Sequence, residues 1–204
     1  WNLGAQGQVL FGGLCSVSVM FYLNSGYWET HKWLVIVLML AAAIIGGIIW
    51  AVIPAIFKSI WNTNESLFTL MMNYIAIQLV TCMINVWVPS GSSVMGVVNQ
   101  KTKIGWMPQM KFPEAWNMSS AGENYFYNIV IVLVLTVVMY VYFKYSKHGY
   151  EISVVGESVN TAKYIGINVK KVIIRTLVLS GMICGLAGFL LVSGTDHSIA
   201  KTLD

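Results

Sequence analysis

Long stretches without any charged side chain constrain this chain more than any other feature. Five such stretches occur, and only the last contains a charge, Arg175; they are 1–28, 33–57, 66–100, 124–143 and 172–194. An α-helix needs about 20 apolar residues to cross roughly 30 Å of hydrocarbon, and it satisfies its own backbone hydrogen bonds there. The sequence therefore predicts an all-α fold, a polytopic transmembrane helical bundle.

The composition excludes a soluble domain. Of the 204 residues, 57% are hydrophobic and 10% are charged, whereas a soluble domain carries about 25% charged residues. The net charge of +4 would suit nucleic acid, but six of the twelve basic residues gather in or beside one connection: Lys144, Lys147, Lys163, Lys170, Lys171 and Arg175. This pattern is typical of a cytoplasmic loop, so we expect membrane lipid as a partner and no nucleic acid.

We expect about five membrane segments, at Val9–Leu23, Leu34–Phe57, Ser66–Val88, Asn128–Phe143 and Val172–Ser193. If residues 144–171 form the cytoplasmic loop, alternation places residues 89–124 in an extracytoplasmic loop. The chain starts at Trp1 without a signal-peptide pattern and ends soon after an apolar segment. We therefore expect an internal fragment of a longer protein.

The long loop 89–124 contains Pro89, Pro108 and Pro113 together with Trp106 and Trp116. Loops of this length with apolar residues of their own are often structured. A docking surface for a delivery protein and a plain packed cap both fit this composition.

The third apolar segment carries a polar stripe. At about 100° per residue, six polar residues fall within roughly 140° of a helix, and the opposite arc is apolar; they are Ser66, Asn73, Tyr74, Gln78, Thr81 and Asn85. Polar side chains in membrane helices usually face the bundle interior or a wet cavity. The stripe predicts either hydrogen bonds between helices or a translocation wall for a neutral polar solute.

Reactive groups are missing from the apolar segments. None contains Asp or Glu, and His31, His148 and His197 lie in connections. Cation-coupled carriers and membrane enzymes generally rely on such groups. Cys15, Cys82 and Cys184 occur singly, without metal-ligand spacing. We expect no catalytic residue, no metal and no cofactor.

Small residues recur at close helical spacing in the second and fifth segments, at Ala43, Gly47 and Ala51 and at Gly181 and Gly185. Because lipid gives helices little hydrophobic drive to associate, close backbone contact through such faces packs them together. This pattern predicts that both segments pack closely against other helices of the bundle.

The basic connection contains one predicted short helix, bracketed by Gly156 and Gly166, with Glu157 or Ser158 as the cap. Val159, Ala162 and Ile165 give it an apolar edge. A short isolated helix is marginal in water, so we expect it to pack against the bundle or against another subunit.

Three motifs resemble a known family. Asn2-Leu3-Gly4-Ala5-Gln6-Gly7-Gln8 resembles N-I-G-A-E-G-Q of bacterial ABC importer permeases for simple sugars and nucleosides. Asn64-Glu65-Ser66 with Met72-Asn73-Tyr74-Ile75-Ala76 resembles the family's N-E-x(5–7)-M-x-N-Y-I-A stretch, and 149–167 followed by 180–188 resembles its inner loop and next helix. The subgroup most similar is the nucleoside permeases paired with a basic-membrane-protein-type lipoprotein. Gln6 stands where the motif has Glu.

The resemblance implies a partial transmembrane permease domain over residues 1–204. Its partners would be ATP-binding subunits on the cytoplasmic side, a second permease subunit and an extracytoplasmic substrate-binding lipoprotein. A coupling helix at about Ser158–Ile165 would contact the ATPase, through Gly156, Glu157, Ala162, Tyr164 and Gly166. The stretch Asn2–Gln8 would be an irregular break beside the substrate path.

Together with the polar stripe, the resemblance gives the expected substrate-pathway residues: Asn2, Gln6, Gln8, Asn73, Tyr74, Gln78, Thr81 and Asn85. The predicted function is the permease subunit of an ATP-driven importer for nucleosides or simple sugars, multi-pass in the bacterial cytoplasmic membrane. ATP hydrolysis would occur on a separate subunit. A secondary carrier or channel for a neutral polar solute and an ABC permease for branched-chain amino acids are the alternatives.

Overall fold

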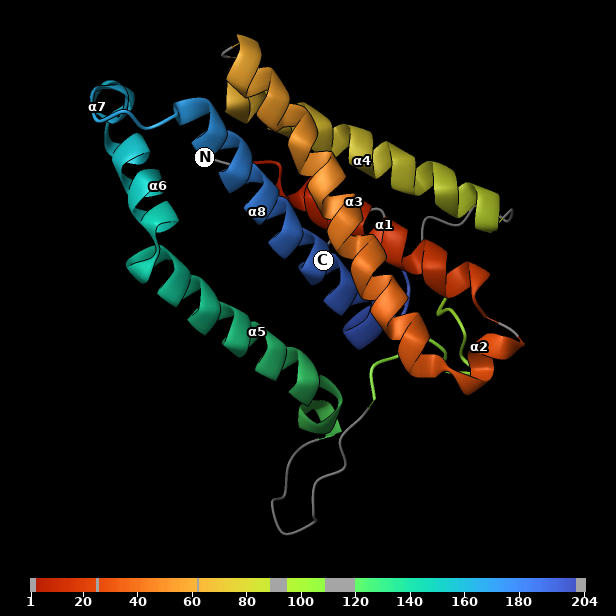
Figure 1. Ribbon diagram of the computed structural model, residues 1–204. Coiled ribbons are helices and arrows are strands. Elements are labelled where there is room, and N and C mark those ends of the chain that lie inside the picture. The colour runs from red at the N-terminus through yellow and green to blue at the C-terminus, as the bar shows by residue number, and fades with distance from the viewer. Residues whose placement is uncertain (1–2, 25, 62, 89–94, 109–119, 201–204) are drawn as a thin grey trace.

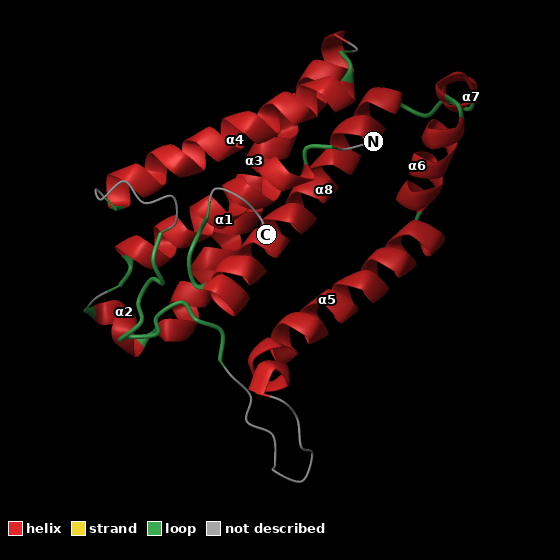
Figure 2. Cartoon of the chain, turned by 180° about the vertical axis from the view of Figure 1, so that it is seen from behind, coloured by secondary structure: helices red, strands yellow, loops and turns green. Residues whose placement is uncertain are grey.

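The computed structural model describes residues 3–24, 26–61, 63–88, 95–108 and 120–200, which form helices joined by turns and loops (Figures 1 and 2). The helices are α1 (Ala5–Tyr22), α2 (Tyr27–Thr30), α3 (Lys32–Trp61), α4 (Glu65–Trp87), α5 (Ser120–Tyr145), α6 (Lys147–Glu157), α7 (Val159–Tyr164) and α8 (Val169–Leu190). A π-helical segment, Leu191–Asp196, continues α8. The prediction of an all-α bundle is confirmed.

Four described helical segments are long and apolar enough to cross a membrane: Lys32–Trp61, Glu65–Trp87, Tyr125–Tyr145 and Val169–Asp196. The first of the five predicted segments corresponds to α1, which does not belong to this set. Its 18 residues span about 27 Å, and glycine, serine and glutamine make it less apolar. These small and polar residues suit a helix that is surrounded by other helices rather than by lipid.

Each predicted segment is a helix, but most of the helices start earlier than expected. Asn64 explains the start of α4, because its Oδ1 accepts hydrogen bonds from the backbone N–H groups of Ser66 and Leu67 at 3.1 and 3.4 Å. This is an N-cap, which satisfies donors that the first helical turn leaves free. α3 runs through Pro54, which is buried inside the helix.

The centre of the bundle consists of α1, α3 and α8, which touch through glycine. A Cβ at Gly12 of α1 would lie 2.8 Å from the Cα of Gly185 in α8. A Cβ at Gly47 of α3 would collide with the carbonyl of Gly181, and one at Gly185 with the carbonyl of Ala43. The small-residue faces predicted for the second and fifth segments are therefore the surfaces on which α3 and α8 meet.

α4 packs on this centre through one face. Its buried residues are Thr69, Met72, Asn73, Ala76, Val80 and Ile84. Phe68 of α4 also stacks on Phe57 of α3, with ring centroids 4.8 Å apart. The remaining circumference of α4 is exposed and includes Leu67, Met71 and Val86.

α5 stands apart from the other long helices (Figures 1 and 2). Among the described residues 125–145 of α5, none is buried. α6 and α7 continue from α5 and return the chain to α8 (Figure 1). We call α5, α6 and α7 together the arm.

Residues 95–108 lie at the other end of the bundle from α7 (Figure 1). We call this segment the cap, because Met95, Val98 and Ile104 are buried in the core beneath it. Ser193 fixes it to the end of α8, since its Oγ donates to the carbonyl of Gly105 at 2.7 Å and its carbonyl accepts from Met107 N–H at 3.0 Å. The part of the predicted outer loop that the structure describes is thus packed.

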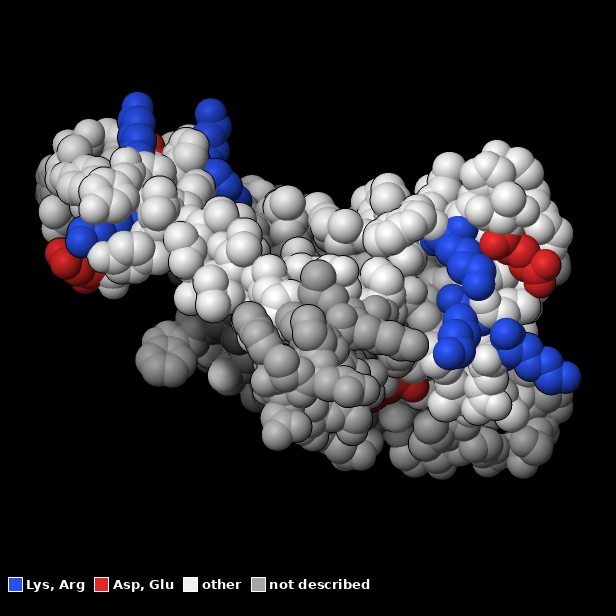
Figure 3. Space-filling model, turned by 90° about the horizontal axis from the view of Figure 1, so that it is seen from below, with Lys and Arg blue, Asp and Glu red and all other residues white. Residues whose placement is uncertain are grey.

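Charged residues gather near the ends of the molecule. Viewed from below, Lys and Arg side chains form two separate groups, with mostly uncharged surface between them (Figure 3). This is the distribution expected for helices whose middle lies in hydrocarbon and whose ends reach water.

Candidate solute and coupling sites

α1 begins inside the bundle, and a side chain from another helix caps it. Gly4 at the N-cap position has no side chain to offer the first turn. Asn73 of α4 supplies the missing acceptor, because its Oδ1 accepts from Gly7 N–H at 2.9 Å. Its Nδ2 donates to the carbonyl of Leu3 at 2.9 Å. One amide therefore ties α4 to both sides of the start of α1.

The capping of α1 by Asn73 changes the expectation of an irregular break over Asn2–Gln8. Gln6, Gly7 and Gln8 belong to α1, which is regular from Ala5 onward; Asn2 lies outside the described residues. Helix is possible here because Asn73 replaces the absent N-cap side chain. Gly7 permits the contact, since a Cβ there would be 2.8 Å from Asn73 Oδ1.

The start of α1 lies at middle depth in the bundle. Asn73 is about two turns into α4, and Trp50 is about three turns before the end of α3. These distances correspond to about 12 and 16 Å from the end at which α3 and α4 are connected. Two of the predicted pathway residues, Gln8 and Asn73, come together at this depth.

A buried indole faces the same place. Trp50 is 6% exposed and stacks on Phe11 of α1 with ring centroids 4.4 Å apart. Its Nε1 is buried and has no hydrogen-bond partner in the part of the chain that the structure describes. A Cβ at Gly7 would be 3.2 Å from this nitrogen. A buried donor without a partner costs about 1–3 kcal/mol, so this N–H needs an explanation.

Gln8 extends the polar group toward α8. It is 1% exposed, and Ser180 Oγ donates to its Oε1 at 3.5 Å. The polar groups around the start of α1 therefore come from four helices. We call Leu3, Gly7, Gln8, Trp50, Asn73 and Ser180 the α1 junction.

The structure separates Asn73 from the rest of the polar stripe. Gln78 and Asn85 are exposed, and Tyr74 is 71% exposed. Thr81 is half-buried and donates to the carbonyl of Ile77 in its own helix at 2.8 Å. Asn73 thus makes the predicted hydrogen bonds between helices, and a translocation wall formed by the exposed stripe residues stays a prediction.

Helical geometry explains the difference. With Asn73 at 0° and about 100° per residue, the buried face of α4 is centred near −40° and the stripe near +70°, so only the edge of the stripe is buried. Apolar side chains can fill a bundle interior or face lipid, and the sequence pattern did not distinguish the two. Gln6 is also exposed, on the first turn of α1. The amide-bearing face of α4 is thus directed away from the other helices described.

At the opposite end from the cap, α7 is a short helix with a defined start and stop. Ser158 has an extended backbone, and its Oγ accepts from Thr161 N–H at 3.3 Å. Gly166 has φ 85°, and the N–H groups of Gly166 and Ile167 donate to the carbonyls of Lys163 and Ala162 at 3.1 and 2.9 Å. These two bonds form a Schellman motif, for which the left-handed glycine is required.

The prediction for this helix was right about Ser158 and Gly166 and wrong about Gly156. α6 includes both Gly156 and Glu157, because a single glycine in an exposed turn does not end a helix. The predicted apolar edge is also divided, since Ala162 is buried while Ile165 is 57% exposed. Tyr164 at the end of α7 is 92% exposed. α7 therefore offers a large aromatic side chain to the surroundings.

An ion pair ties the arm to α8. The guanidinium Nη2 of Arg175 donates to Glu151 Oε2 at 2.6 Å, and His148 Nδ1 lies 3.6 Å from the same oxygen. The hydrogen bond from Arg175 lowers the pKa of Glu151 from its ordinary value, and His148 adds to this effect, while partial burial opposes it. Arg175, the charge inside the fifth apolar segment, is thus paired at the end of the bundle.

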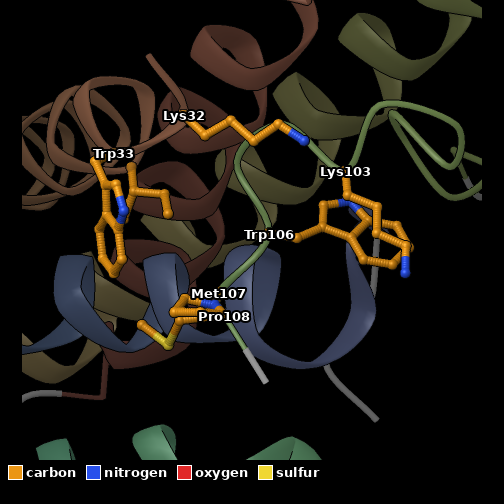
Figure 4. Close-up of a pocket in the computed structure, with 7 residues that line it drawn as sticks. Lys32, Trp33, Lys103, Trp106, Met107 and Pro108 are labelled. Carbon is orange, nitrogen blue, oxygen red and sulfur yellow. The ribbon is translucent and has the colours of Figure 1, made fainter. Parts of the chain in front are cut away.

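A cavity of about 330 Å³ opens beside the cap, lined by Lys32, Trp33 and Ile36 of α3 and by Lys103, Trp106, Met107 and Pro108 (Figure 4). Both ammonium groups already have neighbours: Lys32 Nζ donates to Thr102 O at 2.6 Å, and Lys103 Nζ lies 5.9 Å from the ring of Trp106. The cavity therefore belongs to the seating of the cap on α3.

Sequence reasoning missed Trp50 and Ser180 as members of a polar site. Trp50 lies in a run of apolar residues, where tryptophan is read as a hydrophobic side chain. Ser180 entered only as the first residue of the stretch 180–188 that resembles the family. Pro54 could have drawn attention to Trp50, because a proline has no N–H to donate to the carbonyl four residues earlier.

The chain matches the family described as "Branched-chain amino acid transport system / permease component" over residues 1–203. It is 28% identical over 190 residues to the nucleoside ABC transporter permease protein of Lactococcus lactis, covering 92% of this chain and 50% of that protein. It is 28% identical over 189 residues to the guanosine ABC transporter permease protein of Bacillus subtilis, covering 92% and 51%.

A third relative, the glucose ABC transporter permease protein of Haloferax volcanii, is 23% identical over 202 residues, covering 96% of this chain and 50% of that protein. The chain thus spans about half the length of these curated relatives. No solved structure matches it.

Proposed function

Because this chain belongs to the branched-chain amino acid transport system permease component family, we propose that it is part of the membrane-spanning subunit of an ATP-driven importer for nucleosides or simple sugars. The protein is an integral membrane protein, and we place it in the bacterial cytoplasmic membrane. It would carry no catalytic group itself. ATP would be hydrolysed by separate subunits at the end of the bundle that carries α7.

The observation that carries this proposal is the exposure of α7. A six-residue helix with its own cap and stop, and with Tyr164 92% exposed, is marginal without a partner. It lies at the opposite end of the bundle from the cap (Figure 1). A groove on an ATP-binding subunit would cover Tyr164, and α6 would transmit its displacement to α5 and, through Glu151 and Arg175, to α8.

The solute class follows from the charges. Apart from Arg175, which Glu151 neutralises, the five apolar stretches contain no charged residue. A nucleoside or a sugar is neutral and needs only hydrogen bonds. A branched-chain amino acid is a zwitterion, and its two charges would have no counter-charge at this depth. The relatives named for nucleoside, guanosine and glucose transport support the neutral class.

The outward direction of the α4 stripe supports a solute pathway at the edge of this chain. Exposed amides such as Gln78 and Asn85 are unfavourable in lipid. A second permease subunit facing α4 would enclose them in a shared passage. A substrate-binding lipoprotein would deliver the solute at the end of the bundle that carries the cap.

Uptake by the full-length permease tests this function. The permease is reconstituted with its ATP-binding subunits in proteoliposomes, and entry of labelled nucleosides, glucose and leucine is compared with and without ATP. We expect ATP-dependent entry of nucleosides or glucose and none of leucine. Entry that persists without the ATP-binding subunits would identify a carrier or channel, and leucine entry alone would identify an amino-acid permease.

The role of α7 has its own test. Tyr164→Ala removes an exposed ring, so the thermal stability of the permease should not change. We expect about a tenfold loss of solute-stimulated ATP hydrolysis, because a buried aromatic anchor at an interface is worth about 1.4 kcal/mol or more. Tyr22→Ala, which removes a 67% exposed ring at the other end, is the matched control. Normal stimulation in the Tyr164 variant would remove α7 from the coupling contact.

A further inference from the structure

The α1 junction contains one polar group that the fold does not use. The amide of Asn73 is engaged on both sides, by Gly7 N–H and by the carbonyl of Leu3. Gln8 and Ser180 bond to each other. The indole N–H of Trp50 has no partner among the described residues, although the side chain is 94% buried and its atom Nε1 is inaccessible. The fold therefore carries an unpaired donor at the depth where α1 begins.

The neighbours of this donor define where it lies. Nε1 of Trp50 and Oδ1 of Asn73 would lie 3.2 and 2.8 Å from a Cβ at Gly7. The indole also stacks on Phe11, with ring centroids 4.4 Å apart. The nitrogen therefore lies beside the first turn of α1 and near the Asn73 amide of α4, where the space depends on a glycine.

We propose that the indole N–H of Trp50 is a solute-contacting hydrogen-bond donor, and that it binds an acceptor oxygen or ring nitrogen of a neutral solute such as a nucleoside or a sugar. The inference rests on the proposed transport function and names one residue of its solute site. Transporters bind solutes near the middle of the membrane, where a helix begins within the bundle. The start of α1 combines this depth with polar groups from four helices.

The Asn73 amide bonds to both Gly7 and Leu3 at the start of α1, near Nε1. A solute would therefore reach the indole only when α4 moves away from α1. The hydroxyl groups of the solute then replace the amide as partners of the first turn. The exposed stripe of α4, with Gln78 and Asn85, provides the path by which the solute arrives.

Trp50→Phe in the full-length permease, assembled with its ATP-binding subunits, tests the donor directly. The substitution keeps an aromatic ring against Phe11 and removes only the N–H and part of the indole. We expect the KM for the transported nucleoside or sugar to rise about tenfold, as for the loss of one buried hydrogen bond. The maximal rate of uptake and ATP hydrolysis without solute should stay within about twofold.

Trp87→Phe is the matched control. Trp87 of α4 also has a buried Nε1 without a partner and also stacks on a phenylalanine, Phe21, with centroids 5.3 Å apart. It lies at the end of α4, away from the start of α1. Its KM should remain that of the unaltered permease. A similar KM increase in both variants would mean that loss of indole packing is responsible, and would overturn the proposal.

Two further measurements keep the test sharp if Trp50→Phe assembles poorly. Benzothienylalanine at position 50 keeps the shape of indole and replaces its N–H with sulfur, so it should assemble normally and show the same rise in KM. A solute analogue lacking the contacted oxygen should bind less well to the unaltered permease and lose nothing more in the position-50 variants.

The outcomes separate this proposal from the transport function. Normal KM values in both position-50 variants, with ATP-dependent uptake intact, would overturn the role of Trp50 and leave the transport function standing. No ATP-dependent uptake by the unaltered permease would overturn the transport function itself.

Discussion

The central helices and α5 have similar hydrophobicity and opposite surroundings. In α1, α3 and α8, backbones touch through Gly12, Gly47 and Gly185, where a single added carbon would collide. In α5, the most apolar side chains are exposed, with Leu133 at 61% and Ile129 at 58%. Figure 2 shows the same contrast in space, with α5 separated from the packed helices.

This contrast indicates how the work is divided. Close contact between backbones, with small residues on both sides, fixes the centre in one arrangement. Ile131 of α5 packs against the core, but most α5 side chains are exposed, so the position of this helix depends mainly on what surrounds it. Glu151 and Arg175 make the described ion pair between the two regions. The centre is thus the closely packed region, and the arm is the surface that we propose the partners contact.

The largest effect should follow from filling the centre. Gly185→Leu would push a side chain into the carbonyl of Ala43, which belongs to the backbone and cannot move away. We expect the free energy of unfolding to fall by more than about 4 kcal/mol, so that no folded permease remains. The monodisperse peak in detergent size-exclusion chromatography measures the amount of folded protein. Gly156→Leu in α6, where a Cβ meets nothing within 4 Å, is the control. A normal peak for Gly185→Leu would show that the centre is not tightly packed.

A smaller loss of stability should follow from removing the Asn73 side chain that caps the N-terminus of α1. Asn73→Leu removes the partner of the buried Gly7 N–H and of the part-buried Leu3 carbonyl, and the unpaired Gly7 N–H alone costs about 1–3 kcal/mol. We expect a lower melting temperature of the purified permease, measured by its fluorescence on heating. Gln78→Leu on the exposed face of the same helix should leave the melting temperature unchanged or raise it. Equal melting temperatures in the two variants would contradict the role of Asn73 as the N-cap of α1.

The smallest effect concerns the tie between the arm and α8. Because the pKa of Glu151 is lowered in the folded protein, the tie is fully present above the ordinary glutamate value of about 4.3. It is lost as the pH falls through the lowered pKa, when Glu151 becomes protonated. We expect the protection of α6 amides against hydrogen exchange, measured relative to the intrinsic rate at the same pH, to fall over this acidic range and not near neutral pH.

Glu151→Gln should remove this pH dependence, because the neutral amide does not titrate there. Exchange in α6 that responds to acid equally in the variant would assign the effect to another group. α4, which has no contact with this pair, provides the reference amides in the same experiment.

The sequence predicted the helices and their class because lipid allows few alternatives for long apolar segments. Gly47 and Gly181 were identified as packing residues, since small residues have one main use in such helices. The role of Asn73 in the solute pathway remains a prediction, and its role as the cap of α1 was not visible, because Gly7 is 66 residues away. The unpaired N–H of Trp50 could not be predicted for a related reason. Whether an indole N–H has a partner depends on the side chains around it, which come from distant parts of the sequence.

Ser158 illustrates the limit at shorter range. Its side chain and position predict a helix start, and the structure has one there. Gly156 was given the same weight, although helix propensity alone does not decide whether a glycine interrupts a turn. The division between α6 and α7 depends on the extended backbone of one residue, which a pattern of residue types does not specify.

Pro54 gives α3 a place to bend without disturbing the contacts of its longer part. Proline has no N–H to donate to the carbonyl of Trp50, so one backbone hydrogen bond of the helix is missing. Val35 to Ala51 can then stay locked against α1 and α8 while the last two turns, toward Trp61, tilt as a separate unit. A tilt there would carry α4 with it. The helix would bend next to Trp50, the residue that we propose contacts the solute.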